Sequence, residues 1–293
     1  MNTAPGQAAA DRAAAGQDLF AVRPGYLAAA EDAGLLHRLD GLPVVAGPYT
    51  DPLTGEAQCL VEHADPALLA DPGRLLAELF ARHPDCTAAV LRTPAGTPGD
   101  PRLHPLISYL HLTPEAAAGA AARAAAPAVR ITEDDGEHRG LVRGWLATAV
   151  SGAQADLGAE VAEEAVRAAV EEILRTPARR TWLVWADGHD RPIGHATTVT
   201  DAEDDAAGTP FVDLVDILIE EPAHVPAAQP ALVAVAAAEA ARRGLPLVGH
   251  VCHHRTGPGL PPDPGTAVVA ALRRHGWQES YGYRRADRPQ GRP

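Results

Sequence analysis

Two apolar stretches near the C-terminus carry side chains that could act as acid and base. The run 211–219, FVDLVDILI, places Asp213 and Asp216 among hydrophobic residues. Burying such a carboxylate without a partner is costly, and burial raises its pKa toward that of a general base. The bland alternatives are an ion pair with an arginine or exposure at the strand end. Strand alternation predicts that Asp213 and Asp216 point to opposite faces of the sheet.

A second cluster follows in the run 247–254, LVGHVCHH. Strand alternation places three ligand-type side chains on one face, and His253 on the other. The three are His250, Cys252 and His254. They could bind zinc, or His250 could act as an acid or base opposite Asp213. Metal sites usually draw ligands from several elements, so we expect no metal here. The remaining alternative is an ordinary strand end, and His195 is likewise expected to be structural.

The composition limits the classes of function. The chain has 293 residues, 46% of them hydrophobic and 22% charged, which is typical of a globular protein of one or two domains. Its net charge of −13 argues against a broad nucleic-acid surface and leaves only a local patch, for example for tRNA. Lysine is absent although arginine, alanine and glycine abound, which is typical of a GC-rich bacterial genome. A glycine missing from a motif is therefore informative.

The cellular setting is predicted from what the sequence lacks. Cys59, Cys86 and Cys252 are irregularly spaced, as expected for reduced thiols. Residues 1–18 have no basic and apolar regions of a signal peptide, and we expect them to form a disordered tail. No apolar run is long enough to span a membrane. We expect a cytoplasmic protein without a membrane partner, and the oligomeric state is not predicted.

The elements that position these side chains fall into two segments. Residues 19–112 predict a small α+β domain with one helix at Pro72–Arg82, whose leucines share a face. Its strands are expected at Leu42–Ala46, Gln58–Glu62, Ala88–Leu91 and Leu106–Leu110. Residues 113–127 are Ala-rich and predict a linker or a short surface helix.

Residues 128–286 predict a second domain with the order β-α-α-β-β-β-α-β-α-β, followed by a tail at 287–293. Thr132 and Asp135 resemble a capping box that opens the first helix. Apolar residues at intervals of four from Leu157 to Ile173 predict the second helix. The later elements are a hairpin around 187–190, a strand at 211–219, and then 230–243, 247–252, 266–275 and 281–285. The fold class predicted is thus a mixed α/β sheet.

This order contains the hairpin DGHDRPIG at 187–194, the strand and Ala-rich helix at 211–244, and LRRHGW at 272–277. It resembles the GNAT superfamily of acyl-CoA N-acyltransferases over 128–286. The resemblance implies that two central strands splay apart around an acyl thioester, with Asp213 as general base and His250 lining the cleft. The segment 19–112 is then a degenerate copy of the half-fold or an unrelated α+β module.

The resemblance also implies where acetyl-CoA, or another acyl-CoA, would bind. The cofactor-binding residues it gives are Ile217, Leu218, Ile219, His224, Ala227 and Gln229. The first three lie on the strand that pairs with the pantetheine arm, and the last three on the turn that holds the pyrophosphate. In the family, Ala227 and Gln229 correspond to glycines, and Pro226 and Pro230 remove amide donors for an anion. Binding of CoA through this turn is therefore in question.

Three functions follow from this pattern. The first is transfer of an acyl group from acyl-CoA to a small-molecule amine. The second uses another donor, a carrier-protein thioester or an aminoacyl-tRNA, for which the pyrophosphate turn is dispensable. The third is a non-catalytic binding or regulatory protein. Tyr281 and Tyr283 on the last strand could line the cleft, although alternating aromatics pack in a core by default.

Overall fold

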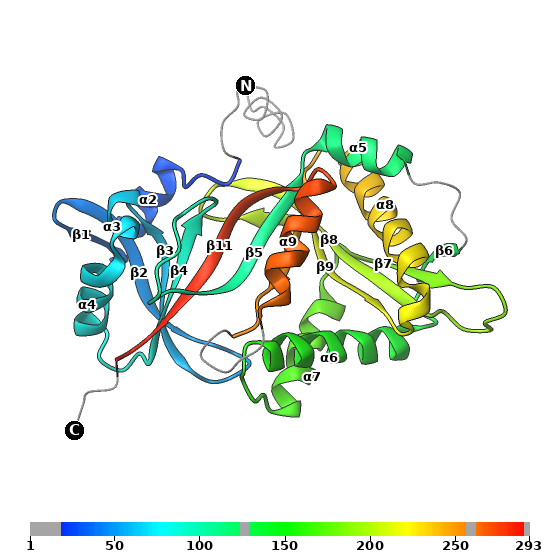
Figure 1. Ribbon diagram of the computed structural model, residues 1–293, viewed down its shortest axis with the longest axis horizontal. Coiled ribbons are helices and arrows are strands. Elements are labelled where there is room, and N and C mark those ends of the chain that lie inside the picture. Colours follow the sequence, from blue (N-terminus) through cyan, green and yellow to red (C-terminus); the bar gives the residue numbers. More distant parts are fainter. Residues whose placement is uncertain (1–18, 124–128, 256–261, 290–293) are drawn as a thin grey trace.

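The computed structural model describes residues 19–123, 129–255 and 262–289. Within these ranges, eleven strands form one mixed sheet in the order β1-β2-β3-β4-β11-β5-β10-β9-β8-β7-β6 (Figure 1). This sheet and its helices confirm the predicted mixed α/β class. The predicted tail 1–18, part of the predicted linker and the last four residues lie outside the described ranges. No helix in the described part is long and apolar enough to cross a membrane.

The first segment supplies five strands and four helices, including the one in the predicted linker. They are α2 (Pro24–Asp32), β1 (Leu36–Leu39), β2 (Leu42–Thr50), β3 (Ala57–Ala64), α3 (Pro66–Ala70), α4 (Pro72–Arg82), β4 (Ala88–Pro94), β5 (His104–Leu112) and α5 (Pro114–Arg123).

The second segment continues from the far edge of the sheet. Its elements are β6 (Arg130–Glu133), α6 (Arg139–Asp156), α7 (Glu163–Arg175), β7 (Arg179–Trp185), β8 (Gly194–Asp204), β9 (Thr209–Ile219), a 3₁₀ turn (Pro222–His224), α8 (Val225–Arg243), β10 (Leu247–Cys252), α9 (Pro264–Arg274) and β11 (Gln278–Asp287).

Three of the predicted helix starts are wrong. Helix α7 begins at Glu163, six residues after the predicted Leu157, which instead lies at the C-terminal cap of α6. Thr132 lies in β6, where its hydroxyl accepts the indole N–H of Trp185, and α6 begins only at Arg139 without a side-chain cap. The expected capping box is therefore absent. Helix α8 begins at Val225, five residues before the predicted Pro230, because a proline is compatible with the early turns of a helix. By contrast, α4 and β10 have the predicted bounds.

The two segments exchange strands at the centre of the sheet. Strand β5 of the first segment pairs with β10 and β11 of the second, and β11 in turn lies between β4 and β5. Figure 1 shows β5 and β11 side by side, with β1–β4 on one side and β6–β10 on the other. The segments thus share one hydrogen-bonded sheet.

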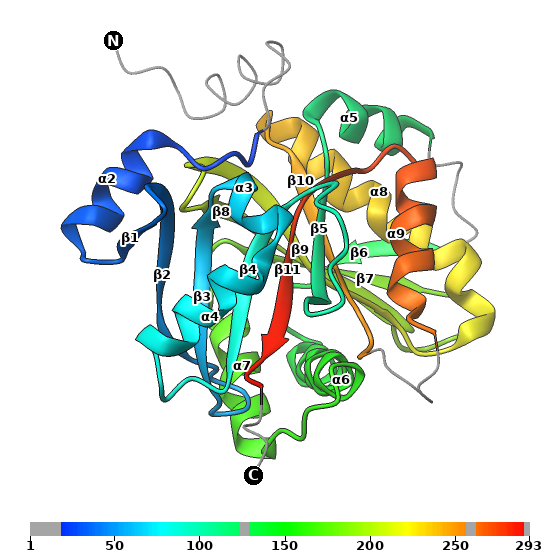
Figure 2. The same ribbon diagram turned by 60° about the vertical axis from the view of Figure 1, so that its left-hand side comes forward.

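Helices cover the sheet in separate layers. Helices α5 and α8 pack on the second-segment strands around Leu232 and Trp277, and α3 and α4 pack on β2–β4 around Leu75 (Figure 2). On the opposite face of the second segment, α6 and α7 pack on β7 through Trp145 and Leu183. The sheet face that α6 and α7 cover extends to β5, β11 and β3. The side chains of these three strands line a cavity.

Candidate functional site

Strands β9 and β10 pair for only part of their length. They are parallel neighbours where Val212–Leu214 faces Leu247–Gly249. Beyond that point, and among the residues that the structure describes, β9 pairs only with β8, and β10 only with β5. The two strands therefore part after Leu214 and Gly249, which leaves one edge of β9 unpaired. The splay that the family resemblance implies is present in this chain.

Asp213 and His250 lie together at the start of this splay. Asp213 is the register neighbour of Val248, and His250 is two residues further along β10, so both side chains are on the same face. Burial raises the pKa of the Asp213 carboxyl, and the nearby His250 imidazole acts in the opposite direction. His250 itself is exposed. The structure thus brings together a partly buried carboxylate and an exposed imidazole.

Asp216 faces the same side as Asp213, and the prediction of opposite faces is wrong. Asp213 is opposite Val199 on β8, and Asp216 is opposite Thr197, so the four residues 213–216 of β9 face only the three residues 197–199 of β8. This β-bulge at Val215 shifts the alternation by one residue. The position of a bulge cannot be recognised in a run of apolar and acidic residues. Strict strand alternation therefore predicted the wrong face for Asp216.

Because of the bulge, Asp216 meets His195. Nε2 of His195 lies 3.0 Å from an Asp216 oxygen, and the imidazole is fully buried. The ring stacks on the indole of Trp145 at 5.2 Å between centroids, and Nδ1 is 3.0 Å from the Thr197 hydroxyl. His195 is therefore held on every side by α6 and β8–β9, as expected for a structural residue.

The unpaired edge of β9 contains Ile217, Leu218 and Ile219. The side chains of Ile217 and Ile219 pack on the core beneath α8, whereas Leu218 packs toward α6 and α7. On the opposite, paired edge of β9, Gly194 of β8 approaches closely, since a Cβ there would lie 2.3 Å from the Leu218 carbonyl oxygen. The glycine of the hairpin motif thus allows β8 to hold β9 in place while the other edge of β9 stays free.

The expected pyrophosphate turn is replaced by helix. His224 ends the 3₁₀ turn, and Ala227 and Gln229 lie inside α8 rather than in a loop. Pro226 has no N–H, and the N–H of Val225 donates to the Pro222 carbonyl. An anion at this helix end would thus meet fewer main-chain donors than a glycine turn offers. These residues do not fit a pyrophosphate held in the family's manner.

Three side chains instead converge at this end of α8. The rings of His189 and His224 are 5.3 Å apart and nearly perpendicular, and Nε2 of His224 is 3.5 Å from Glu221. Their ligand-type atoms lie within 4.8 Å of one another. Sequence spacing does not predict this group, because His189 comes from the β7–β8 hairpin, far from Glu221 and His224 along the chain.

A cavity of about 550 Å³ opens on the same face as Asp213. It lies between the β3, β5 and β11 side chains and the connection from α6 to α7, around Gln154–Glu160. Tyr109 of β5 lines this cavity, and its ring is 6.0 Å from that of His250. Burial, together with the charge of Asp213, raises the pKa of the Tyr109 phenol. Tyr109 therefore connects the cavity to the Asp213–His250 pair.

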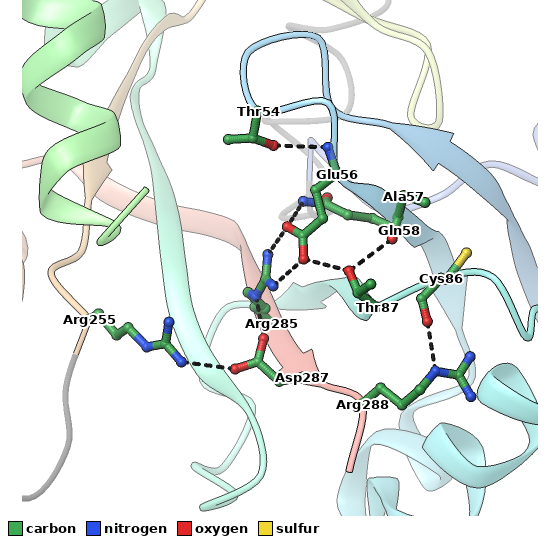
Figure 3. Close-up of polar contacts among 10 residues, drawn as sticks. All are labelled: Thr54, Glu56, Ala57, Gln58, Cys86, Thr87, Arg255, Arg285, Asp287 and Arg288. Atoms are coloured by element: carbon green, nitrogen blue, oxygen red, sulfur yellow. Dashed lines mark hydrogen bonds and ion pairs between the residues drawn. The ribbon is translucent and has the colours of Figure 1, made fainter. Parts of the chain in front are cut away.

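The cavity lining is rich in carboxylates. The carboxylates are Asp51, Glu56, Glu62, Glu160 and Asp287, and the guanidinium groups are Arg255 and Arg285. Both arginines are already in ion pairs with carboxylates of the same cavity (Figure 3). The lining of the cavity consequently carries a net negative charge, which favours a cationic ligand.

The pKa values of two of these carboxylates differ because their surroundings differ. Two hydrogen bonds of 2.6 Å from Arg285 lower the pKa of Glu56 to about 2. Burial instead raises the pKa of Glu62, although the Tyr283 hydroxyl donates to it at 3.0 Å. Sequence reasoning missed this site because its residues come from both segments, which meet only through the exchange of β5 and β11.

No protein-family model matches the chain, and no curated protein matches it. Among solved structures, an acetyltransferase of the GNAT family from Colwellia psychrerythraea is similar over 98% of this chain and 97% of its own, with 10% identity and a TM-score of 0.44.

Two further structures show the range of these similarities. A functionally unknown conserved protein from Staphylococcus epidermidis ATCC 12228 is similar over 80% of this chain and 86% of its own (10% identity, TM-score 0.47). The aminoglycoside N-acetyltransferase AAC(6')-Iy, in complex with CoA, is similar over 52% of this chain and 89% of its own (20% identity, TM-score 0.34). Similarity at this level transfers no activity to this chain.

Proposed function

We propose that this protein transfers an acyl group from a thioester to a small-molecule amine. The observation that carries the proposal is Asp213, a carboxylate of raised pKa beside His250 at the point where β9 and β10 part. An ammonium group must lose a proton before its nitrogen can attack a carbonyl carbon. A carboxylate with a raised pKa accepts such a proton more readily than an ordinary one.

Some residues of the splay would bind the donor, and others would transfer protons. The free main-chain groups at Ile217–Ile219 would hold an extended donor arm by strand-like hydrogen bonds. A thioester placed there supplies the acyl group. Asp213 takes the proton from the amine as the N–C bond forms and the C–S bond breaks. His250, which is exposed, relays a proton between solvent and the site, and the departing sulfur is protonated.

The acceptor would enter through the cavity lined by Tyr109. Its carboxylates outnumber its guanidinium groups, which favours amines that carry one or more positive charges. Tyr109 separates these carboxylates from the Asp213–His250 pair, so an amine that reaches past its ring arrives beside the base.

The helical start of α8 bears on the donor. Because Ala227 and Gln229 lie within the helix, the nucleotide part of CoA would have to be held by side chains such as those of His224 and Gln229 rather than by a turn of main-chain donors. A carrier-protein thioester, which presents the same arm without a free nucleotide, fits this end of the site better. Aminoacyl-tRNA is the other donor, and salt-sensitive binding of charged tRNA would identify it.

Titration calorimetry and a turnover assay test the proposal together. The protein is titrated with acetyl-CoA and with an acetylated carrier protein, and each donor is then incubated with a panel of mono- and polyamines. We expect acylated amine with at least one donor. Asp213→Asn should lower turnover about 100-fold, the usual size of a lost general base, while donor binding stays within about twofold. Donor binding without turnover in the wild type would favour a regulatory protein, and no binding of any donor would refute the proposal.

A further inference from the structure

A second set of side chains lies on the opposite face of the sheet from Asp213. Oγ of Ser108, on β5, is 2.9 Å from Nε2 of His253, which follows β10. Nδ1 of the same imidazole is 2.7 Å from Oδ2 of Asp263, the N-cap of α9. A hydroxyl, an imidazole and a carboxylate are thus joined in a line through the two ring nitrogens.

Asp263, the carboxylate of this hydrogen-bonded series, is ionised. Asp263 is buried, which would raise its pKa, but hydrogen bonds hold the pKa well below the usual range. The donors are the His253 ring, the main-chain N–H groups of His254, Gly265 and Thr266, and the Thr266 hydroxyl.

An ionised Asp263 accepts only, so Nδ1 of His253 carries the proton. In the neutral ring, Nε2 is then the acceptor for the Ser108 hydroxyl. The imidazole is oriented so that it can take the serine proton.

The environment of Ser108 distinguishes this line from a purely structural bond. Ser108 and His253 line a cavity of about 310 Å³, together with Val269 and Arg273 of α9. The register neighbour of Ser108 on β11 is Gly282, which has no side chain to cover the hydroxyl. The cavity gives a small ligand room beside the Ser108 hydroxyl, which a purely structural hydrogen bond between β5 and the start of α9 does not require.

We propose that Ser108 is a nucleophile, activated by His253 and Asp263, that accepts the acyl group of small esters or thioesters. The Oγ–acyl bond forms as the ester C–O or thioester C–S bond breaks. The serine proton passes to Nε2 of His253 and then to the leaving alcohol or thiol. Water attacks the acyl-serine with its proton going to the same nitrogen, and the free acid and the hydroxyl are restored.

The position of Ser108 in the sheet sets the expected rate. Ser108 is paired with Val251 on one side and Gly282 on the other, so its amide belongs to the strand ladder and is not free to stabilise an oxyanion. We therefore expect slow turnover, and acyl-serine should be detectable by mass. The cavity volume restricts the acyl group to a short chain.

A fluorophosphonate probe, which reacts with activated serines, tests the proposal on the full chain. We expect one adduct per molecule by intact mass, located at Ser108 by peptide mapping, and slow hydrolysis of p-nitrophenyl acetate. Ser108→Ala should remove the adduct, and His253→Gln should slow labelling about 100-fold, the size of a lost general base. Asp213→Asn should label like the wild type, so the outcome is independent of acyl transfer at the splay.

Folding of each variant is checked by its thermal midpoint, because Asp263 also caps α9. Ser108→Cys, which keeps the size of the side chain and is read out with iodoacetamide, serves if Ser108→Ala is unstable. It should alkylate faster than the same variant carrying His253→Gln. No adduct on folded wild-type protein, or an adduct that persists in Ser108→Ala, would overturn the proposal.

Discussion

Asp216 on β9 lies 3.0 Å from the fully buried imidazole of His195 on β8 and faces the same side of the sheet as Asp213. Two carboxylates three residues apart therefore face the splay, with different partners. Asp216 has its imidazole within ion-pair distance, whereas burial dominates at Asp213 and raises its pKa. Asp213 is the proposed base, and Asp216 on the same face provides a matched control for mutation.

Asp213→Asn should lower acyl transfer about 100-fold, the usual size of a lost general base. It should leave stability at neutral pH unchanged or increased. The folded-state pKa of Asp213 is raised, so the native state binds more protons than the unfolded state, and this contribution to stability is lost as pH rises. Turnover and thermal midpoints at pH 4–8 measure both effects. A variant that lost activity only because it was less stable would contradict the assignment.

Asp216→Asn should instead destabilise the fold by about 1–3 kcal/mol, because the buried His195 loses its charged partner. Acyl transfer per folded molecule should change much less than in Asp213→Asn. Chemical denaturation and active-site-normalised turnover provide the measurement. If Asp216→Asn were the more severe catalytic defect, the roles of the two carboxylates would be reversed.

Removing the nucleotide from the donor should weaken its binding only slightly. Because the start of α8 is helical and contains Pro226, the pyrophosphate of CoA gains few main-chain hydrogen bonds. Acetyl-pantetheine should thus show a KM within about threefold of acetyl-CoA, a difference of less than about 1 kcal/mol in binding. Steady-state kinetics with both donors decides this. A much higher KM for acetyl-pantetheine would indicate a working nucleotide site, and His224→Ala would then test its residues.

Cationic acceptors should depend on the cavity carboxylates. Glu160→Gln should raise KM for a diamine several-fold and leave kcat unchanged, because Glu160 lines the cavity away from the base. The effect should shrink at high salt, as for any exposed charge. Glu164→Gln, an exposed change on α7 outside the cavity, is the control. Equal effects of the two substitutions would place the acceptor elsewhere.

Glu56 should stabilise the cavity wall in a pH-dependent manner. Its pKa is lowered to about 2 by Arg285, so its contribution to stability is present above the unfolded pKa of 4.5 and is lost as pH falls toward 2. Glu56→Gln should cost about 1 kcal/mol at pH 7, after allowance for solvent screening. The difference from wild type should vanish near pH 2, as followed by denaturant titrations. A difference independent of pH would contradict the ion-pair origin.

Gly194→Ala should destabilise the protein by about 1–3 kcal/mol, the usual cost of overpacking. The added Cβ would lie 2.3 Å from the Leu218 carbonyl oxygen, so β8 or β9 must shift. Gly144→Ala on α6, where a Cβ meets nothing within 4 Å, should be neutral or stabilising. Thermal denaturation compares the two. Donor binding should weaken only in Gly194→Ala, because that substitution moves the free edge of β9.

The mixed α/β class and the positions of β9, β10 and α4 could be predicted from the amino-acid sequence alone. These features depend on local alternation and helical periodicity, which are properties of adjacent residues. The same reasoning placed Asp216 on the wrong face, because a bulge depends on the neighbouring strand rather than on the run itself.

The contacts between distant segments depend on the tertiary structure. The cavity, the His189–His224 contact and the Ser108–His253–Asp263 line each join residues from elements distant in the chain. Such contacts arise from strand order, and the exchange of β5 and β11 is set by packing and hydrogen bonding across the whole sheet. Local sequence patterns do not indicate which strands will become neighbours, so the cavity could be recognised only in the folded chain.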